Sequence, residues 1–338
     1  MVLKIWQDIE KGKLHPLFLV TGTENFLLQE TTKKIVQAGL NEEEKDFNLS
    51  VHDMEETSVD VAIEDAETLP FLGEKRIVII QNPVFLTAEK KKEKIDHNLD
   101  RLIQYIQEPA PFTTMVFSAP YEKLDERKKI TKLIKKQAQI VEAKNLSNNE
   151  TELFIHSLAK QEGNTIESAA VLEIMFLTNG NLTAISQEMN KLCTYAGFGN
   201  DITQELTSQL VARSLEQNIF ELIDKVVNKK GEKALQIFYD LLKTNEEPIK
   251  ILSLITTQFR LILQTKQLSS AGYGQKQIAG NIKIHPYRVK LALEQARLFD
   301  EEELKDIIKQ LADADYELKT GKKDKKLIIE LFLLKLFK

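Results

Sequence analysis

Short apolar runs alternate with helix-like patterns along the first 144 residues. Between the runs, apolar residues recur every three or four positions, as in Phe26–Ala38 and Ser58–Glu67, which predicts amphipathic helices. Strands that are continuously apolar and separated by helices are typical of a parallel sheet covered on both faces. We therefore predict an α/β domain over residues 1–144. The predicted strands are Leu17–Val20, Phe47–His52, Arg76–Gln81, Thr113–Ser118 and Gln139–Ala143.

After Asn145 the strand-like runs disappear and helical patterns take over. Ser147 and Glu150 form a capping-box pattern that opens the first of four predicted helices over residues 145–212. The remainder, 213–338, is helical again, and its last helix, from Lys325, is apolar on almost every side. Such a helix is expected to be buried inside a bundle or against another subunit. The fold class is thus α/β plus all-α, in three domains.

The segment Leu69-Pro70-Phe71-Leu72-Gly73 stands directly before the predicted strand at Arg76. Three large apolar side chains surround a proline and are followed by a glycine, so the segment is predicted to be a turn. It is either a contact site for a partner or a helix-to-strand connection that folds back on the core. Taken alone, the residues favour the second alternative, because isolated exposed apolar residues are normal.

A strand, a glycine turn and a helix at residues 17–38 have the frame of a phosphate-binding loop but not its chemistry. Gly22 is followed by Thr23 and Glu24, and the second glycine, the Lys and the Ser/Thr of the motif G-x-x-x-x-G-K-[ST] are absent. Gln81-Asn82 and Ala119-Pro120 also stand where an NTPase would place an Asp for magnesium. We predict a nucleotide-fold framework with a degenerate loop, no catalytic residue and no cofactor.

The amino-acid composition limits the number of domains, the classes of partner and the compartment that we expect. The 338 residues carry 42% hydrophobic and 29% charged residues with a net charge of -5, which indicates two or three globular domains and argues against a general nucleic-acid or membrane-surface binder. The single Cys193 cannot form an internal disulfide, and with no signal-peptide pattern we expect a cytoplasmic protein. The five histidines lack metal-ligand spacing, so no metal site is expected.

Local basic residues remain as candidate contacts with DNA or with other subunits. Lys128, Lys129 and Lys132 lie on a predicted Lys-rich helix over Asp125–Gln137, and Arg260 and Arg288 lie in the C-terminal helices. A solvated helix face is the default interpretation for the lysines. Ion pairs between helices or subunits are the default for the two arginines.

Three features together resemble one family over nearly the whole chain, the delta subunit of the bacterial DNA polymerase III clamp loader, most closely its Gram-positive versions. They are the degenerate phosphate-binding loop at Leu19–Glu24, the segment Gly180–Leu192, and the C-terminal residues Gln258–Arg260 with His285–Arg288. The spacing to Asp315 and Lys319 also fits. The resemblance implies an AAA+ (RecA-like) core, a helical lid and a helical collar that joins a hetero-pentameric ring.

The resemblance also implies a function. In that family the delta subunit does not bind ATP productively, and it inserts an apolar turn into a hydrophobic pocket of the sliding clamp (beta) to help open it for loading onto primed DNA. The matching residues here are Leu69, Phe71 and Leu72, and Pro70 departs from the best-known pattern. The Ser-Arg-Cys arginine-finger motif of the ring ATPases is absent.

The implied partners are the clamp, the tau/gamma and delta-prime subunits, and primer–template DNA through the complex; no membrane partner is implied. The chain would be a non-catalytic subunit of the DNA polymerase III holoenzyme, a DNA-directed DNA polymerase (nucleotidyltransferase), at the replisome on the nucleoid. Two alternatives are an AAA+-derived adaptor that docks on another replication factor such as a helicase, and an active NTPase with an unusual phosphate loop.

Overall fold

The computed structural model describes residues 2–88, 95–211, 215–282, 284, 286–321 and 324–336. The chain divides into two compact units, residues 1–145 and 146–338, and each is described by itself. The predicted boundary between residues 212 and 213 lies outside the described residues, and so does His285 of the C-terminal motif.

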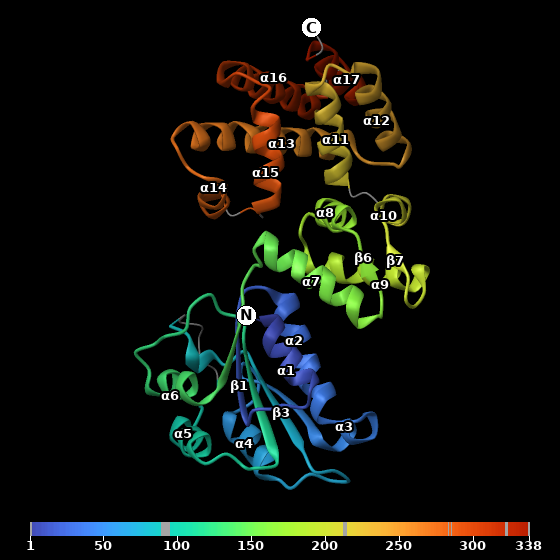
Figure 1. Ribbon diagram of the computed structural model, residues 1–338. Coiled ribbons are helices and arrows are strands. Elements are labelled where there is room, and N and C mark those ends of the chain that lie inside the picture. Colours follow the sequence, from blue (N-terminus) through green and yellow to red (C-terminus); the bar gives the residue numbers. More distant parts are fainter. Residues whose placement is uncertain are drawn as a thin grey trace. The chain divides into compact units, whose positions relative to one another are not determined.

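The first unit is built on one parallel sheet (Figure 1). The neighbouring strands pair in the order β2-β3-β4-β1-β5, and every pair is parallel. The central strands are buried on both faces, as their unbroken apolar sequences require. This confirms the predicted parallel α/β sheet. The strands are β1 (Leu17–Gly22), β2 (Leu49–Asp53), β3 (Arg76–Gln81), β4 (Thr113–Ala119) and β5 (Gln139–Ala143).

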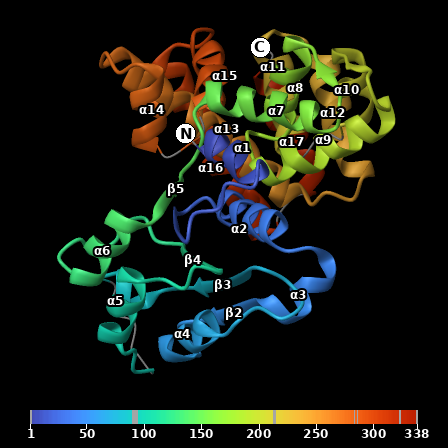
Figure 2. The same cartoon turned by 60° about the horizontal axis from the view of Figure 1, so that its bottom comes forward.

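Helices cover both faces of this sheet (Figure 2). Helices α1 and α2 pack on one face, and α4, α5 and α6 pack on the other, where they share a hydrophobic core with the sheet. The bounds are α1 (Val2–Glu10), α2 (Asn25–Gly39), α3 (Glu42–Asn48), α4 (Val59–Glu67), the 3-10 turn η1 (Val84–Leu86), α5 (Leu99–Gln107) and α6 (Lys129–Gln137).

Two predicted elements of this unit were placed wrongly. The strand predicted at Phe47–His52 begins at Leu49, because residues 42–48 form α3, whose start is fixed by a capping box between Asn41 and Glu44. The helix predicted from Asp125 begins at Lys129, because the Asp125 carboxylate accepts the Arg127 backbone N–H at 3.1 Å and forms a turn there.

The second unit is helical. Its first part also contains a pair of two-residue parallel strands, which the sequence did not indicate. Asn164 lies next to this pair and donates to the carbonyls of Gly197 and Asn200, so it ties the two connections together. The elements are α7 (Asn148–Gln161), β6 (Thr165–Ile166), α8 (Ser168–Leu177), α9 (Leu182–Ala196), β7 (Asp201–Ile202) and α10 (Gln204–Leu210).

The rest of this unit packs around the long helix α13, which contacts α11, α15, α16 and α17 and shares their core. The last helix is only half buried: Ile329 and Leu333 are inside the core, whereas Leu327, Leu331 and Leu334 are exposed along one side. Within the described ranges, no helix is both long and apolar enough to cross a membrane. The helices are α11 (Leu215–Val227), α12 (Gly231–Lys243), α13 (Pro248–Ser270), α14 (Gln275–Ile282), α15 (Pro286–Ala296), α16 (Glu301–Thr320) and α17 (Lys325–Lys335).

Candidate partner-binding site

The connection between α4 and β3 exposes three large apolar side chains. Helix α4 ends at Glu67, and β3 begins at Arg76, with neither helix nor strand between them. Leu69 is 72% exposed, Phe71 is 55% exposed and Leu72 is 74% exposed. The predicted turn therefore does not fold back on its own core. We call Leu69, Pro70, Phe71 and Leu72 the apolar turn.

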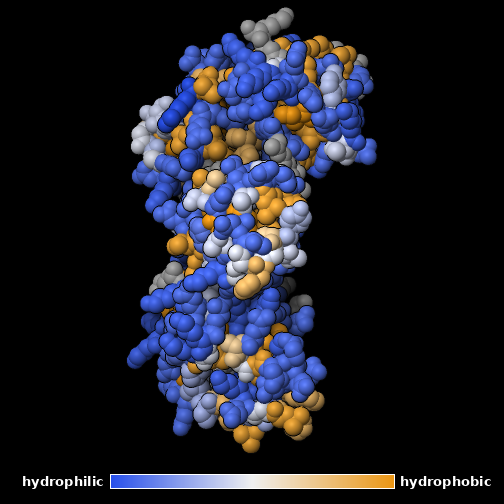
Figure 3. All heavy atoms as spheres, turned by 45° about the vertical axis from the view of Figure 1, so that its right-hand side comes forward, coloured by the Kyte–Doolittle hydropathy of each residue, from blue (hydrophilic) through white to orange (hydrophobic). Residues whose placement is uncertain are grey.

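Apolar atoms gather at this end of the first unit. Figure 3 shows them at the bottom of the view, the end at which the α4–β3 connection lies in Figure 1. Phe47, at the end of α3, is 53% exposed, and its ring packs edge-on against Phe71 with 5.2 Å between the ring centroids. The exposed apolar surface is therefore made by two elements that are distant in sequence.

The backbone of the apolar turn is held by Asn48. The Asn48 carboxamide is fully buried, donates to the Phe71 carbonyl at 2.7 Å and accepts from the Phe71 N–H at 2.7 Å. The two bonds replace the backbone pairing that a neighbouring strand would give to Phe71. The next residue, Leu72, has a φ of 54°, in the left-handed region that bulky side chains seldom adopt. The turn thus has one defined shape.

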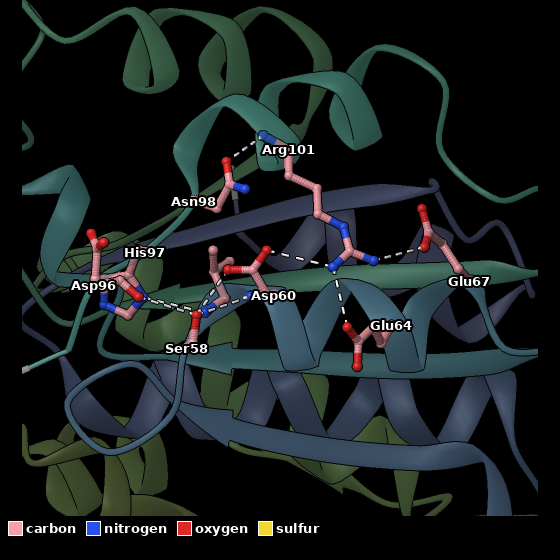
Figure 4. Close-up of polar contacts among 9 residues, drawn as sticks. Ser58, Asp60, Glu64, Glu67, Asp96, His97, Asn98 and Arg101 are labelled. Atoms are coloured by element: carbon pink, nitrogen blue, oxygen red, sulfur yellow. Dashed lines mark hydrogen bonds and ion pairs between the residues drawn. The ribbon is translucent and has the colours of Figure 1, made fainter.

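Helix α4, which leads into the turn, is fixed to its surroundings by polar contacts (Figure 4). The Arg101 guanidinium on α5 forms ion pairs with Asp60, Glu64 and Glu67, which follow one face of α4, at distances of 3.2 to 3.5 Å. The pKa of Arg101 is raised above its usual value, mainly by the hydrogen bond to Glu64. Close to the end of α4, the Thr113 hydroxyl donates to the Ala66 carbonyl at 2.7 Å. The turn therefore starts from a fixed point.

In the degenerate phosphate loop, a side chain of the loop itself occupies the position of a phosphate. The Glu24 carboxylate accepts the Phe26 N–H at 3.4 Å and so occupies the N-terminus of α2, the place where a phosphate would bind. Gly22 has a φ of 141°, and a Cβ at this position would lie 2.0 Å from the Ala143 carbonyl oxygen. The glycine is thus explained by the close approach of β1 to β5 and needs no nucleotide.

The three lysines proposed as DNA or subunit contacts are not equivalent. The Lys128 ammonium donates to the backbone carbonyls of Phe85 and Thr87 at 3.0 and 2.9 Å, so it holds the η1 segment in place. Lys129 and Lys132 are exposed on α6. Only these last two remain as cations that face solvent from this predicted set.

The two arginines of the C-terminal region also differ. Arg288 on α15 forms an ion pair with Glu216 on α11 at 3.3 Å, as expected for an inter-helix contact. Arg260 is exposed on α13. Among the described residues, no group of three or more His, Cys, Asp or Glu side chains is arranged to hold a metal ion.

The sequence pattern indicates the apolar turn but not the residues that support it. Phe47 and Asn48 lie in a segment predicted as a strand, in which side chains alternate across the sheet. The Asn41-x-x-Glu44 capping pattern, which starts α3, was the available signal for a helix there. The contacts of Asn48 and Arg101 join residues 23 to 41 positions apart, and no local pattern reports them.

The chain matches three family models, two of which describe the same protein. Residues 18–144 match the family described as DNA polymerase III, delta subunit, and residues 216–336 match the DNA polymerase III delta subunit, C-terminal domain. Residues 147–213 match a family described as a middle domain. The predicted three-domain division at 144 and 212 stays a prediction, since the structure separates two units.

One similar protein matches the whole chain, and a second matches most of it. The DNA polymerase III subunit delta of Bacillus subtilis is 60% identical over 338 residues, which are 100% of this chain and 97% of that protein. The probable DNA polymerase III subunit delta of Aquifex aeolicus is 24% identical over 308 residues, 88% of this chain and 85% of that protein.

Among solved structures, the Bacillus subtilis DNA clamp loader delta protein has a TM-score of 0.78 at 60% identity, covering 100% of this chain and 99% of the other. This likeness confirms the predicted fold class, a parallel-sheet α/β domain followed by a helical region. It also confirms the resemblance on which the functional prediction depends.

Proposed function

The chain belongs to the DNA polymerase III delta subunit family, and we propose that it binds the sliding clamp through the apolar turn and helps to open it for loading onto primed DNA. The observation that carries this proposal is the exposure of Leu69, Phe71 and Leu72 on a turn whose backbone is fixed. An aromatic and an aliphatic anchor that fill a preformed pocket commonly supply most of the affinity of an interface.

Opening of the clamp needs more than binding. A ligand shifts a conformational equilibrium only by the difference in its affinity for the two states. The turn therefore has to bind the open clamp more tightly than the closed one. A rigid turn suits this task, because a flexible one would adapt to both states of the clamp and lose the difference.

We infer that the chain itself is non-catalytic and takes no nucleotide. The Glu24 carboxylate at the N-terminus of α2 supports this, because it places negative charge where phosphate would bind. ATP would act through the tau/gamma subunits, with delta-prime, in a pentameric ring. The chain would work in the cytoplasm, at the replisome, and meet primer–template DNA through the complex. Lys129, Lys132 and Arg260 are the exposed cations of the predicted set that such contacts would use.

The test is binding of the full chain to purified sliding clamp, measured by calorimetry. We expect the wild type to bind and Leu69→Ala with Phe71→Ala to bind roughly 30-fold more weakly or worse. Leu153→Ala is a matched control, because Leu153 is 60% exposed on α7 of the other unit and should leave the affinity unchanged. A double variant that binds as well as wild type would refute the site. A wild type that does not bind would refute the function and favour the adaptor alternative.

Nucleotide binding is tested separately. Equilibrium dialysis of the purified chain against labelled ATP should show no retained nucleotide. Stoichiometric retention would contradict the inference from Glu24 and support the active NTPase alternative.

A further inference from the structure

The side chain of Asn48 is buried at the corner between α3 and β2, yet both of its polar ends are used on an exposed turn. Asn48 is 0% exposed, and its two hydrogen bonds go to the backbone N–H and carbonyl of Phe71, 23 residues away, at 2.7 Å each. A buried amide needs hydrogen-bond partners, and Asn48 finds both of them on Phe71. The contact therefore fixes the apolar turn as much as it satisfies Asn48.

The conformation of the turn is one that the chain would not hold unaided. Leu72 has a φ of 54°, and for a residue with a Cβ this left-handed region is disfavoured. Strained backbone of this kind persists where its surroundings determine it. Asn48 bonds to both peptide groups of Phe71, the residue directly before Leu72, and the Phe71 ring packs against Phe47.

We propose that Asn48 is a positioning residue that presets the apolar turn for the hydrophobic pocket of the sliding clamp. It does not touch the clamp; it holds the Phe71 backbone so that the Phe71 and Leu72 side chains are exposed before binding. Ordering a loop during association costs affinity, and a turn that is already ordered avoids this cost. The inference rests on the proposed clamp binding and adds the residue that prepares it.

The experiment measures the turn and the affinity in the same full-length variant. In Asn48→Ala the Phe71 N–H loses its acceptor, so hydrogen exchange over residues 68–75 should become at least roughly tenfold faster in the free chain. Clamp affinity should fall roughly tenfold in calorimetry, although every side chain that contacts the clamp is retained. Asn48→Ser, a milder change, is measured in the same way should the alanine variant not fold.

The control separates positioning from general stability. Thr31 is also fully buried in this unit, and its hydroxyl accepts from Trp6 Nε1 at 2.8 Å on α2, in a contact that does not involve the turn. Thr31→Val should lower the melting temperature as the Asn48 variants do, but it should leave the clamp affinity and the exchange of residues 68–75 unchanged.

Each outcome decides one question. A folded Asn48 variant that binds the clamp like wild type would overturn the positioning role while leaving the proposed function intact. A Thr31→Val variant that loses as much affinity as the Asn48 variants would also overturn it, because general destabilisation would then explain the loss. If the wild-type chain does not bind the clamp, the proposed function itself fails, and this inference fails with it.

Discussion

Truncation of Leu69 should weaken clamp binding without weakening the fold. The Leu69 side chain is 72% exposed in the free chain, so folding gains little from it and a partner can gain most of its burial energy. Full burial of a leucine side chain is worth about 1.5 to 3 kcal/mol, and the exposed share corresponds to about 1 to 2 kcal/mol. Leu69→Ala should therefore raise the Kd for the clamp roughly 5- to 30-fold.

Phe71 provides the contrast within the same turn. It is 55% exposed, and its ring packs against Phe47, so Phe71→Ala removes a contact of the free chain as well as one with the clamp. An edge-on aromatic pair is worth about 0.5 to 1.5 kcal/mol beyond its buried area. We expect Phe71→Ala to lower both the clamp affinity and the free energy of unfolding.

The assay pairs clamp titration with urea denaturation of the same variants. We expect Leu69→Ala to lower the clamp affinity alone, and Phe71→Ala to lower both the clamp affinity and the free energy of unfolding. A Leu69→Ala variant that loses more than about 1 kcal/mol of unfolding free energy would show that the turn packs on its own domain. Unchanged affinity in Leu69→Ala would show that this side chain does not enter the clamp pocket.

Four further predictions concern single residues. Phe47→Ala should weaken clamp binding, because its ring packs against Phe71 and adds exposed apolar surface. The effect should be smaller than that of Leu69→Ala, because Phe47 is 53% exposed and Leu69 is 72% exposed. An affinity equal to that of wild type in calorimetry would exclude Phe47 from the clamp-binding surface. Gly22→Ala should destabilise the first unit severely in thermal unfolding, because its Cβ would lie 2.0 Å from the Ala143 carbonyl oxygen. Gly280→Ala, in an open position on α14, should instead raise the free energy of unfolding by about 0.5 to 1 kcal/mol. Comparable melting temperatures for the two variants would contradict this. The hydrogen bonds from the Arg127 side chain and backbone lower the pKa of Asp125 from 3.8 to about 2. The stabilising contribution of Asp125 is therefore present above about pH 4 and is lost as the pH falls towards about 2. Asp125→Asn should flatten this part of the plot of unfolding free energy against pH, and an unchanged slope would count against the contact. Arg101→Ala should lower the melting temperature more at low salt than at high salt, since it removes three ion pairs with α4; a salt-independent effect would point to lost packing instead.

The parallel sheet was predictable because its signals are local. An apolar run such as Arg76–Gln81 has one stable placement, between two layers of helices, and the structure has it there. The turn at Leu69–Leu72 was predictable as a turn for the same reason, since Pro70 and Gly73 interrupt any regular pattern.

The support of the turn was not predictable in this way. Phe47 has high strand propensity and stands next to a strand, but the capping of α3 by Asn41 and Glu44 takes it into the helix. In our proposal the exposure of Phe71 and Leu72 depends on the hydrogen bonds of Asn48, which join the end of α3 to a residue 23 positions away. Residues alone favoured the opposite, a turn that folds back on its core.

The Asn48 contact has a consequence for the free chain. The hydrogen bonds of Asn48 and the Glu24 cap are both made within the polypeptide, so the apolar turn is exposed without any bound small molecule. In the proposed role, a newly made copy is ready to capture clamps before it joins any ring. Surplus copies would then compete with assembled loaders for the same supply of clamps, and balanced synthesis of the subunits becomes a requirement rather than a convenience.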